Sequence, residues 1–230
     1  MKSELLIVIP AYNEEENIES VVTFIQEKYS QYDYIVVNDG SRDRTADICR
    51  QNGYELLNLP VNLGLAGAFQ AGLKYAYTKG YSYAIQFDAD GQHRPEFIGP
   101  MLERIKQGYD IVIGSRFVHS KKGNSPRMIG SKMITVAIKM TTGIRVSDPT
   151  SGMRMFSKSM IKEFAQNLNY GPEPDTISYL LKNGAKISEV PVRMEERQAG
   201  ESYLNLVNSG KYMIKMLISI LFVQNFRKRG

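Results

Sequence analysis

The stretch Tyr83-Ala-Ile-Gln-Phe-Asp-Ala-Asp-Gly-Gln-His93 is an apolar run that ends in two carboxylates and a glycine. Short apolar runs bounded by turn residues are typical of buried strands. The run predicts a strand over Tyr83–Asp88, with Asp88 and Asp90 at the turn that leaves it. Two carboxylates there can converge on one hard cation, because Mg²⁺ and Mn²⁺ prefer oxygen ligands. Asp-x-Asp is also an ordinary turn sequence, so the pattern is weak when taken alone.

Strand-like runs alternate with helical patterns on both sides of this stretch. The predicted strands are Leu5–Ile9, Tyr34–Asn38, Glu55–Leu59, Ile111–Gly114 and Lys186–Val192, and the predicted helices are Ile18–Lys28, Thr45–Gln51, Ala66–Thr78, Glu96–Lys106 and Ile129–Thr142. This alternation predicts an α/β fold, with a mostly parallel central sheet and helices on both faces. In such sheets the ligand lies beyond the carboxyl ends of the strands. No repeat or linker interrupts the pattern.

Composition excludes several classes of protein. Cysteine occurs once among 230 residues and histidine twice, which excludes a disulfide framework and a Cys- or His-rich metal centre. The net charge of +5 is unevenly distributed, with −7 over residues 1–103, +8 over 104–147, 0 over 148–192 and +4 over 193–230. This separation indicates two kinds of partner on one fold, unless it is only a solvated surface. Nucleic acid is not an expected partner, because the chain has no tryptophan for base stacking.

Polar motifs also follow the first two predicted strands. Val8-Ile-Pro-Ala-Tyr-Asn-Glu-Glu-Glu16 lacks the glycines of a dinucleotide-binding turn. Its tyrosine and carboxylates can instead stack on a base and accept hydrogen bonds from it, or they can simply start a helix. Val37-Asn-Asp-Gly-Ser41 allows the same two interpretations, as a binding loop or as an Asn-Asp-Gly turn.

Five motifs in a fixed order resemble a known family. They are Pro10-Ala-Tyr-Asn-Glu14, Asn38-Asp-Gly-Ser41, Asn62-x-Gly64, Asp88-Ala-Asp-Gly-Gln92 and Gly114-Ser-Arg116. Together they resemble the family 2 glycosyltransferases of the nucleotide-diphospho-sugar transferase fold, and within it the dolichyl- or polyprenyl-phosphate sugar transferases. The resemblance runs from about residue 4 to residue 202. It implies one Rossmann-like catalytic domain over residues 1–203. Residues 204–230 are expected, from their own apolar and basic composition, to form a C-terminal amphipathic helix.

The resemblance implies a donor site in the acidic half. A nucleotide sugar, with uridine favoured over guanosine, would be held by Pro10, Ala11, Tyr12, Glu14, Asp39, Asp88 and Ala89. Mg²⁺ or Mn²⁺ would be held by Asp88, Asp90 and Gln92, with Asp90 also catalytic. Arg197, in a loop near residues 196–202, would reach the diphosphate as a further catalytic group. That loop departs from the family pattern, because Tyr203 stands where a lysine is common.

The resemblance implies an acceptor site in the basic half. A polyprenyl phosphate would contact Arg116, Arg127 and Ser131, and Ser151 would lie near the reacting sugar in the motif Asp148-Pro-Thr-Ser-Gly152. Arginine suits phosphate because its planar fork donates two hydrogen bonds. The family branch often carries paired transmembrane helices after the catalytic domain, and this chain has one short apolar segment in that place.

The nature of the acceptor decides whether a general base is required. The expected reaction is an inverting displacement at the anomeric carbon. A phosphate monoester is mostly dianionic at neutral pH and needs no base, whereas a sugar hydroxyl needs a carboxylate. Asp175, Glu173 and Asp148 are the candidates for that base, although Asp175 and Glu173 could equally serve a helix start. The alternatives are therefore a cytosolic enzyme that extends a glycan and, from another class, a non-catalytic nucleotide-binding module.

The C-terminal segment is apolar with a basic end. Tyr212–Val223 contains 12 residues, about 18 Å of helix, which is short of a hydrocarbon core of about 30 Å. With Arg227, Lys228 and Arg229 beyond it, the segment is expected to lie in the membrane interface. Packing on the core, self-association into an oligomer, or contact with a small membrane protein would explain it as well. The expected location is cytoplasmic, peripheral on the inner face of the cell membrane.

Overall fold

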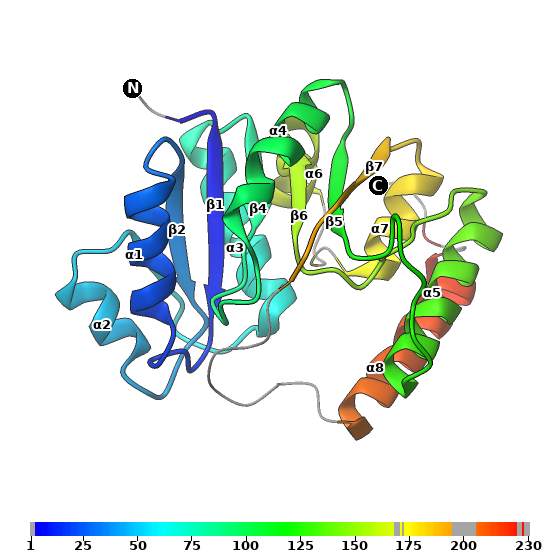
Figure 1. The fold of residues 1–230 in the computed structure, drawn as a ribbon, viewed down its shortest axis with the longest axis horizontal. Coiled ribbons are helices and arrows are strands. Elements are labelled where there is room, and N and C mark those ends of the chain that lie inside the picture. Colours follow the sequence, from blue (N-terminus) through cyan, green and yellow to red (C-terminus); the bar gives the residue numbers. More distant parts are fainter. Residues whose placement is uncertain (1–2, 168–170, 172, 195–205, 225–226, 228–230) are drawn as a thin grey trace.

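Strand β1 (Leu5–Ala11) lies near the middle of a seven-stranded sheet and is buried along its whole length. The computed structural model describes residues 3–167, 171, 173–194, 206–224 and 227 (Figure 1). The strand order is β3-β2-β1-β4-β6-β5-β7. The remaining strands are β2 (Asp33–Asn38), β3 (Leu56–Asn58), β4 (Tyr83–Gln86), β5 (Ile111–Ser115), β6 (Arg154–Ser157) and β7 (Ile187–Pro191).

The expected mostly parallel sheet is confirmed, with one insertion. Strands β1, β2, β3 and β4 pair in parallel with one another, and β5 pairs in parallel with β7. Strand β6 runs antiparallel between β4 and β5. The sequence did not predict β6 or the helix that follows it. Four residues that include a charged side chain, Arg154, are too few to show a strand periodicity.

Helices cover both faces of the sheet, as the alternation predicts. Side chains of β1 alternate between two cores, with Leu5, Ile7 and Ile9 on one face and Leu6 and Val8 on the other. The first face packs against α1 (Ile18–Lys28), α2 (Thr45–Gln51) and α4 (Ile98–Lys106), which follows a 3₁₀ turn, η1 (Pro95–Phe97). The second packs against α3 (Gly64–Lys79), α5 (Pro126–Thr142), α6 (Lys158–Gln166), α7 (Pro174–Lys182) and α8 (Leu206–Ile218).

The C-terminal helix is part of the packed structure. Helices α8 and α5 lie side by side beyond the β5 and β7 end of the sheet (Figure 1). Helix α8 continues into a π-helical turn, η2 (Ser219–Val223). Met213, Met216 and Ile220 are buried in the core, whereas Ile214 and Ile218 are exposed. One face of the segment therefore packs on the core and the other remains uncovered. No helix among the described residues is long and apolar enough to cross a membrane.

Candidate active site

The predicted donor motifs meet at one edge of the sheet because β1 lies between β2 and β4. Ala11 pairs with Asn38 in β2, and Val8 pairs with Gln86 in β4. The Asp39 backbone N–H donates to the Ala11 carbonyl at 2.9 Å. The loops after these parallel strands therefore leave the sheet from the same end, where sheets of this kind bind ligands.

The loops after β1 and β2 are joined by hydrogen bonds. The Asn13 N–H donates to Ser41 Oγ at 3.0 Å, and the Arg42 N–H donates to Asn13 Oδ1 at 2.9 Å. Asn13 has a φ of 55°, a left-handed conformation that asparagine tolerates. Tyr12, in the same loop, is half-buried. The Glu14 carboxylate accepts a hydrogen bond from Asn17 Nδ2 at 2.7 Å. Glu14 thus contacts Asn17, the residue at which α1 begins, while it lies in the predicted donor loop.

Asp39 joins the third motif to this site. Its side chain is buried, and Oδ1 accepts from the Leu63 N–H at 2.7 Å. Burial raises the pKa of the Asp39 carboxyl. Gly40 makes this possible, because it has a φ of 65° and a Cβ there would lie 2.8 Å from the Asn62 nitrogen. The Asn62-x-Gly64 motif therefore lies directly against the loop after β2.

Asp88 is held by its neighbours on and after β4. Gln86 Nε2 donates to Asp88 Oδ1 at 2.9 Å. The Asp88 N–H donates to His93 Nδ1 at 2.8 Å, so a neutral ring carries its hydrogen on Nε2. That Nε2 lies 3.5 Å from Asp88 Oδ2. His93 is buried and stacks edge-on against Phe87. His93 therefore orients Asp88, a role that the sequence interpretation missed.

Gly152 brings a distant motif against the same carboxylate. A Cβ at Gly152 would lie 2.6 Å from Asp88 Oδ2 and 3.2 Å from His93 Cε1. Glycine alone leaves this space open. The motif Asp148-Pro-Thr-Ser-Gly152, separated from β4 by about sixty residues, therefore forms one wall of the site at Asp88.

The carboxylates fit a divalent cation that is shared with a substrate. Asp90 is buried, and its Oδ1 accepts from the Gln92 N–H at 3.1 Å. The described residues contain no group of three or more His, Cys, Asp or Glu side chains placed to hold a metal ion. Mg²⁺ is commonly bound through one or two carboxylates, with substrate phosphates and water at the other positions. Asp88 and Asp90, with the Gln92 amide oxygen, are a donor set of this kind.

The predicted acceptor arginine is held by a carboxylate. Arg116 Nε donates to Asp148 Oδ2 at 2.7 Å and Arg116 Nη2 donates to Asp148 Oδ1 at 2.9 Å. Asp148 is fully buried, and the Arg116 side chain is 23% exposed. The Glu189 carboxylate accepts from the Ser147 and Asp148 N–H groups at 2.8 and 2.9 Å. Arg116 therefore presents only its remaining N–H groups to any anion.

Lys122 accompanies the predicted acceptor residues and was missed from the sequence. Lys122 Nζ donates to Ser131 Oγ at 2.8 Å and to Thr135 Oγ1 at 3.0 Å. Burial lowers the pKa of the Lys122 ammonium from 10.5 to about 8. Ser131 Oγ also lies 3.2 Å from Thr150 Oγ1, which links α5 to the 148–152 motif. The only sequence signal was the excess of positive charge over residues 104–147.

The other predicted residues lie in different settings. Arg127 is exposed on the first turn of α5. Ser151 is buried and donates to the Gly114 carbonyl at 2.5 Å, so its hydroxyl ties the motif to β5. Pro10, Ala11 and Ala89 are buried at strand ends. Arg197 lies outside the described residues.

The candidate bases contact the C-terminal helix. Asp175 Oδ2 accepts from Ser219 Oγ at 2.6 Å and from Gln224 Nε2 at 3.3 Å, and its Oδ1 accepts from the Thr176 N–H. Tyr212 donates its hydroxyl hydrogen to Glu173. Both carboxylates thus join the start of α7 to α8 and η2.

Comparison with known proteins gives a consistent result. The family model described as glycosyl transferase family 2 matches residues 6–164. A polyprenol monophosphomannose synthase of Mycolicibacterium smegmatis is 29% identical over 92% of this chain and 84% of its own length. An undecaprenyl-phosphate mannosyltransferase of Micrococcus luteus is 31% identical over 87% of each chain. A UDP-N-acetylglucosamine–dolichyl-phosphate N-acetylglucosaminyltransferase of Methanococcus voltae is 32% identical over 82% of this chain and 84% of its own.

Solved structures agree in fold. Glucosyl-3-phosphoglycerate synthase of Mycobacterium tuberculosis, in complex with Mn²⁺, UDP and phosphoglyceric acid, superposes with a TM-score of 0.72. The two are 19% identical, and the match covers 100% of this chain and 81% of the other. At that identity the likeness supports the fold of the sheet and its helices.

Proposed function

Because the chain belongs to glycosyl transferase family 2, we propose that it transfers a sugar from a uridine-diphosphate sugar to a polyprenyl phosphate at the membrane surface. The curated relatives support the acceptor, since several are named for transfer to polyprenyl, undecaprenyl or dolichyl phosphate. One observation carries the proposal. A single motif, residues 148–152, contacts both a carboxylate of the donor site and an arginine of the acceptor site. Residues 148–152 contact Asp88 through Gly152 and contact Arg116 through Asp148.

Donor and acceptor groups can thereby act on one sugar. Asp39 and the loop after β1 would hold the nucleoside, and Asp88, Asp90 and Gln92 would hold Mg²⁺ or Mn²⁺ with the diphosphate. A cation bound there supplies electrostatic stabilisation of the departing diphosphate. Arg197 is proposed to donate to the same diphosphate.

The acceptor phosphate needs positioning rather than deprotonation. A phosphate monoester has a second pKa near 6, so one of its oxygens can attack the anomeric carbon directly. The new bond is sugar to phosphate oxygen, and the electron pair of the broken bond leaves on the nucleoside diphosphate. Arg116, Arg127 and Ser131 are proposed to position this phosphate, and Lys122 holds the Ser131 hydroxyl. The partners of Asp175, Glu173 and Asp148 favour this route over transfer to a sugar hydroxyl.

Attachment to the inner face of the membrane is proposed through the uncovered faces of α5 and α8. Ile129, Met133, Val136 and Met140 on α5 are each about half exposed or more, as are Ile214, Ile218 and Phe222 of the C-terminal segment. Exposed apolar surface of this kind is typical of interaction sites. Arg227, Lys228 and Arg229 follow it in the sequence and would lie near anionic headgroups.

A direct assay tests the reaction. The full chain is incubated in detergent with a panel of UDP- and GDP-sugars, undecaprenyl phosphate and Mg²⁺ or Mn²⁺, and the lipid extract is analysed by mass spectrometry. A single sugar-phosphate lipid formed from a UDP-sugar is the expected result. Product found only on soluble glycans, or no product with any donor, would contradict the proposal.

The metal requirement is tested in the same assay. Asp90→Asn should lose about 100-fold in turnover, because one of two carboxylates is removed, and EDTA should abolish transfer until Mg²⁺ or Mn²⁺ is restored. Thermal unfolding of Asp90→Asn serves as the folding control. Full activity of Asp90→Asn in EDTA would remove the metal site from the mechanism.

A further inference from the structure

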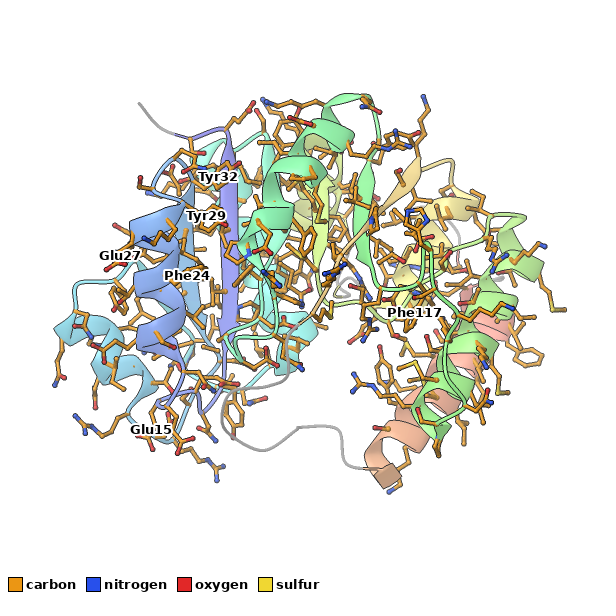
Figure 2. The ribbon with its side chains drawn as sticks, viewed as in Figure 1. Glu15, Phe24, Glu27, Tyr29, Tyr32 and Phe117 are labelled. Atoms are coloured by element: carbon orange, nitrogen blue, oxygen red, sulfur yellow. The ribbon has the colours of Figure 1, made fainter. Side chains whose placement is uncertain are left out.

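A basic pocket lies between the loop after β5 and helix α5. Its volume is about 460 Å³. Phe117, labelled in Figure 2, lies between the end of β5 and α5 and forms part of its wall. The lining residues include five cations and no carboxylate, namely Lys121, Lys122, Lys132, Lys139 and Arg145. We refer to it below as the lysine pocket.

The charge of the lysine pocket is not neutralised by the part of the chain that the structure describes. Lys122 donates only to uncharged oxygens of Ser131 and Thr135, and Lys132 donates to Asn124 Oδ1 at 3.0 Å. Among the described residues, no ion pair involves any of the five cations. The nearby carboxylates of Asp148 and Glu189 are occupied, the first by Arg116 and the second by two backbone N–H groups. Five converging cations without a counter-charge favour a bound anion.

An exposed apolar stripe of α5 meets the pocket at Val136. Val136 lines the pocket and is 55% exposed. Ile129, Met133, Val136 and Met140 follow one another at spacings of four, three and four residues, which places them on one face of α5. An exposed apolar stripe adds no binding free energy for a free inorganic anion, which has no apolar surface to bury. A lipid gains from both features, because its phosphate can enter the pocket while its acyl chains cover the stripe.

The pocket borders Ser131 and extends along α5 away from Arg127, toward the end of the helix. Arg127 is on the first turn, and Lys139 is 12 residues later, about 18 Å along the helix axis. Arg145 and Ser147 come after the helix ends at Thr142. Two lining residues, Lys122 and Thr135, also contact Ser131.

We propose that the lysine pocket binds the phosphate headgroup of an anionic membrane phospholipid that is not the sugar acceptor. The inference rests on the membrane-surface part of the proposed function. A lipid held there anchors the loop after β5 and the end of α5 to the bilayer. It thereby fixes the orientation in which the acceptor residues at the other end of α5 meet the membrane.

Vesicle sedimentation tests the proposal with the full chain. Vesicles of phosphatidylcholine are compared with vesicles that also contain phosphatidylglycerol, at physiological ionic strength. The double variant Lys139→Gln/Arg145→Gln should lower partition onto the phosphatidylglycerol vesicles roughly 30-fold, from about five-fold per cation. The matched control, Lys28→Gln/Lys74→Gln, removes two exposed cations from α1 and α3 and should stay within about two-fold of the unmodified chain. An equal loss of vesicle partition in the two variants would show that only the net charge of the chain matters, and it would overturn the proposal.

Two further experiments distinguish a phospholipid headgroup from free phosphate and from the acceptor lipid. Soluble glycerophosphoglycerol should compete with vesicle binding better than inorganic phosphate at the same ionic strength, and equal competition would make the pocket a general phosphate site. Transfer to a short-chain polyprenyl phosphate in detergent without phosphatidylglycerol should be unchanged in the double variant. Loss of that transfer would assign the pocket to the acceptor instead. Absence of transfer by the unmodified chain would contradict the proposed function alone, because the vesicle comparison would still be readable.

Discussion

Asp88 illustrates how single residues define the candidate site. Gln86 holds one carboxylate oxygen, His93 faces the other, and Gly152 leaves the space beside it open. Glutamine, histidine and glycine are all common structural residues, and none of these three would indicate a functional site by itself. Their convergence on one carboxylate gives the Asp88 side chain a defined orientation.

Gly152→Ala should reduce transfer while the fold is retained. The added Cβ would lie 2.6 Å from Asp88 Oδ2, so the carboxylate must move. Disturbing the surroundings of a metal ligand typically costs 10- to 100-fold in activity, and a loss of roughly that size in turnover is expected if Asp88 holds the proposed cation. Gly123→Ala is the matched control, because a Cβ at Gly123 meets nothing within 4 Å. Similar turnover for the two variants would show that Asp88 tolerates the shift.

Lys122→Met should change how stability depends on pH. Lys122 is faced by Asp148 and Glu189, and by the cations Arg116 and Arg145. Burial lowers its pKa from 10.5 to about 8, so the folded chain carries the cost of a buried charge at neutral pH. That cost is relieved as pH rises from about 8 to 10.5, where the unfolded chain binds more protons.

The comparison is made by chemical denaturation at neutral and at alkaline pH. The variant should be more stable than the unmodified chain near pH 7, and this advantage should shrink above pH 8. Lys74→Met, at an exposed position of α3, should show no such trend. An advantage that is constant with pH would mean that Lys122 is not buried as a charge.

At the scale of elements, α7 and α8 are joined by polar contacts in addition to apolar packing. Ser219 and Gln224 bind Asp175, and Tyr212 binds Glu173. Burial and Glu173 raise the pKa of the Tyr212 hydroxyl, so it remains a donor at neutral pH. These contacts place the C-terminal helix on the catalytic unit rather than leaving it as a separate appendage.

Asp175→Asn should loosen this contact and leave the chemistry intact. The amide has one acceptor oxygen where the carboxylate has two, so it cannot accept from Ser219 and Gln224 and also from the Thr176 N–H. A loss of about 1–3 kcal/mol in the free energy of unfolding is expected. Transfer to polyprenyl phosphate should persist, because that acceptor needs no base. Ser219→Ala provides the comparison that disturbs the contact without touching the carboxylate. If Asp175→Asn abolishes turnover and Ser219→Ala does not, Asp175 acts as a base and the acceptor is a hydroxyl.

At the scale of the whole molecule, acidic motifs gather on one side of the sheet and basic and apolar surfaces on the other. The acidic motifs lie after β1, β2 and β4, and the basic and apolar surfaces lie on the β5 side, over α5 and α8. The chain carries −7 over residues 1–103 and +8 over 104–147. Separation of this kind suits a donor that arrives from water with its cation and an acceptor that arrives from an anionic surface.

Phe222→Ser should weaken membrane attachment without unfolding the protein. Phe222 is 61% exposed on the uncovered side of the C-terminal segment, and burying such a side chain contributes about 1.5 kcal/mol or more. About ten-fold weaker partition onto anionic vesicles is expected in a sedimentation assay.

Phe24→Ser on α1, where Phe24 is 46% exposed, is the matched control (Figure 2). A point substitution is required because removal of α8 and η2 would strip Met213, Met216 and Ile220 from the core. Equal partition of the two variants would assign the apolar face to another role.

Much of the fold follows from the sequence because the relevant signals are local. The alternation of apolar runs and helical patterns predicted Ile18–Lys28 and Thr45–Gln51 with the bounds that α1 and α2 have, and it predicted a mostly parallel sheet. Polar motifs directly after strands predicted where a site would lie, because parallel strands all point their carboxyl ends to one edge. Motif order alone was sufficient to recognise the family.

Only the tertiary structure decided which distant groups meet. Strand β6 enters between β4 and β5, which sets residues 148–152 against both Asp88 and Arg116. Lys122 meets α5 to form a basic pocket, and α8 divides into a buried and an uncovered face. A local pattern reports the periodicity of one segment. Which side chain pairs with which, across 30 or more residues as for Arg116 and Asp148, depends on how all segments pack together to bury their apolar faces.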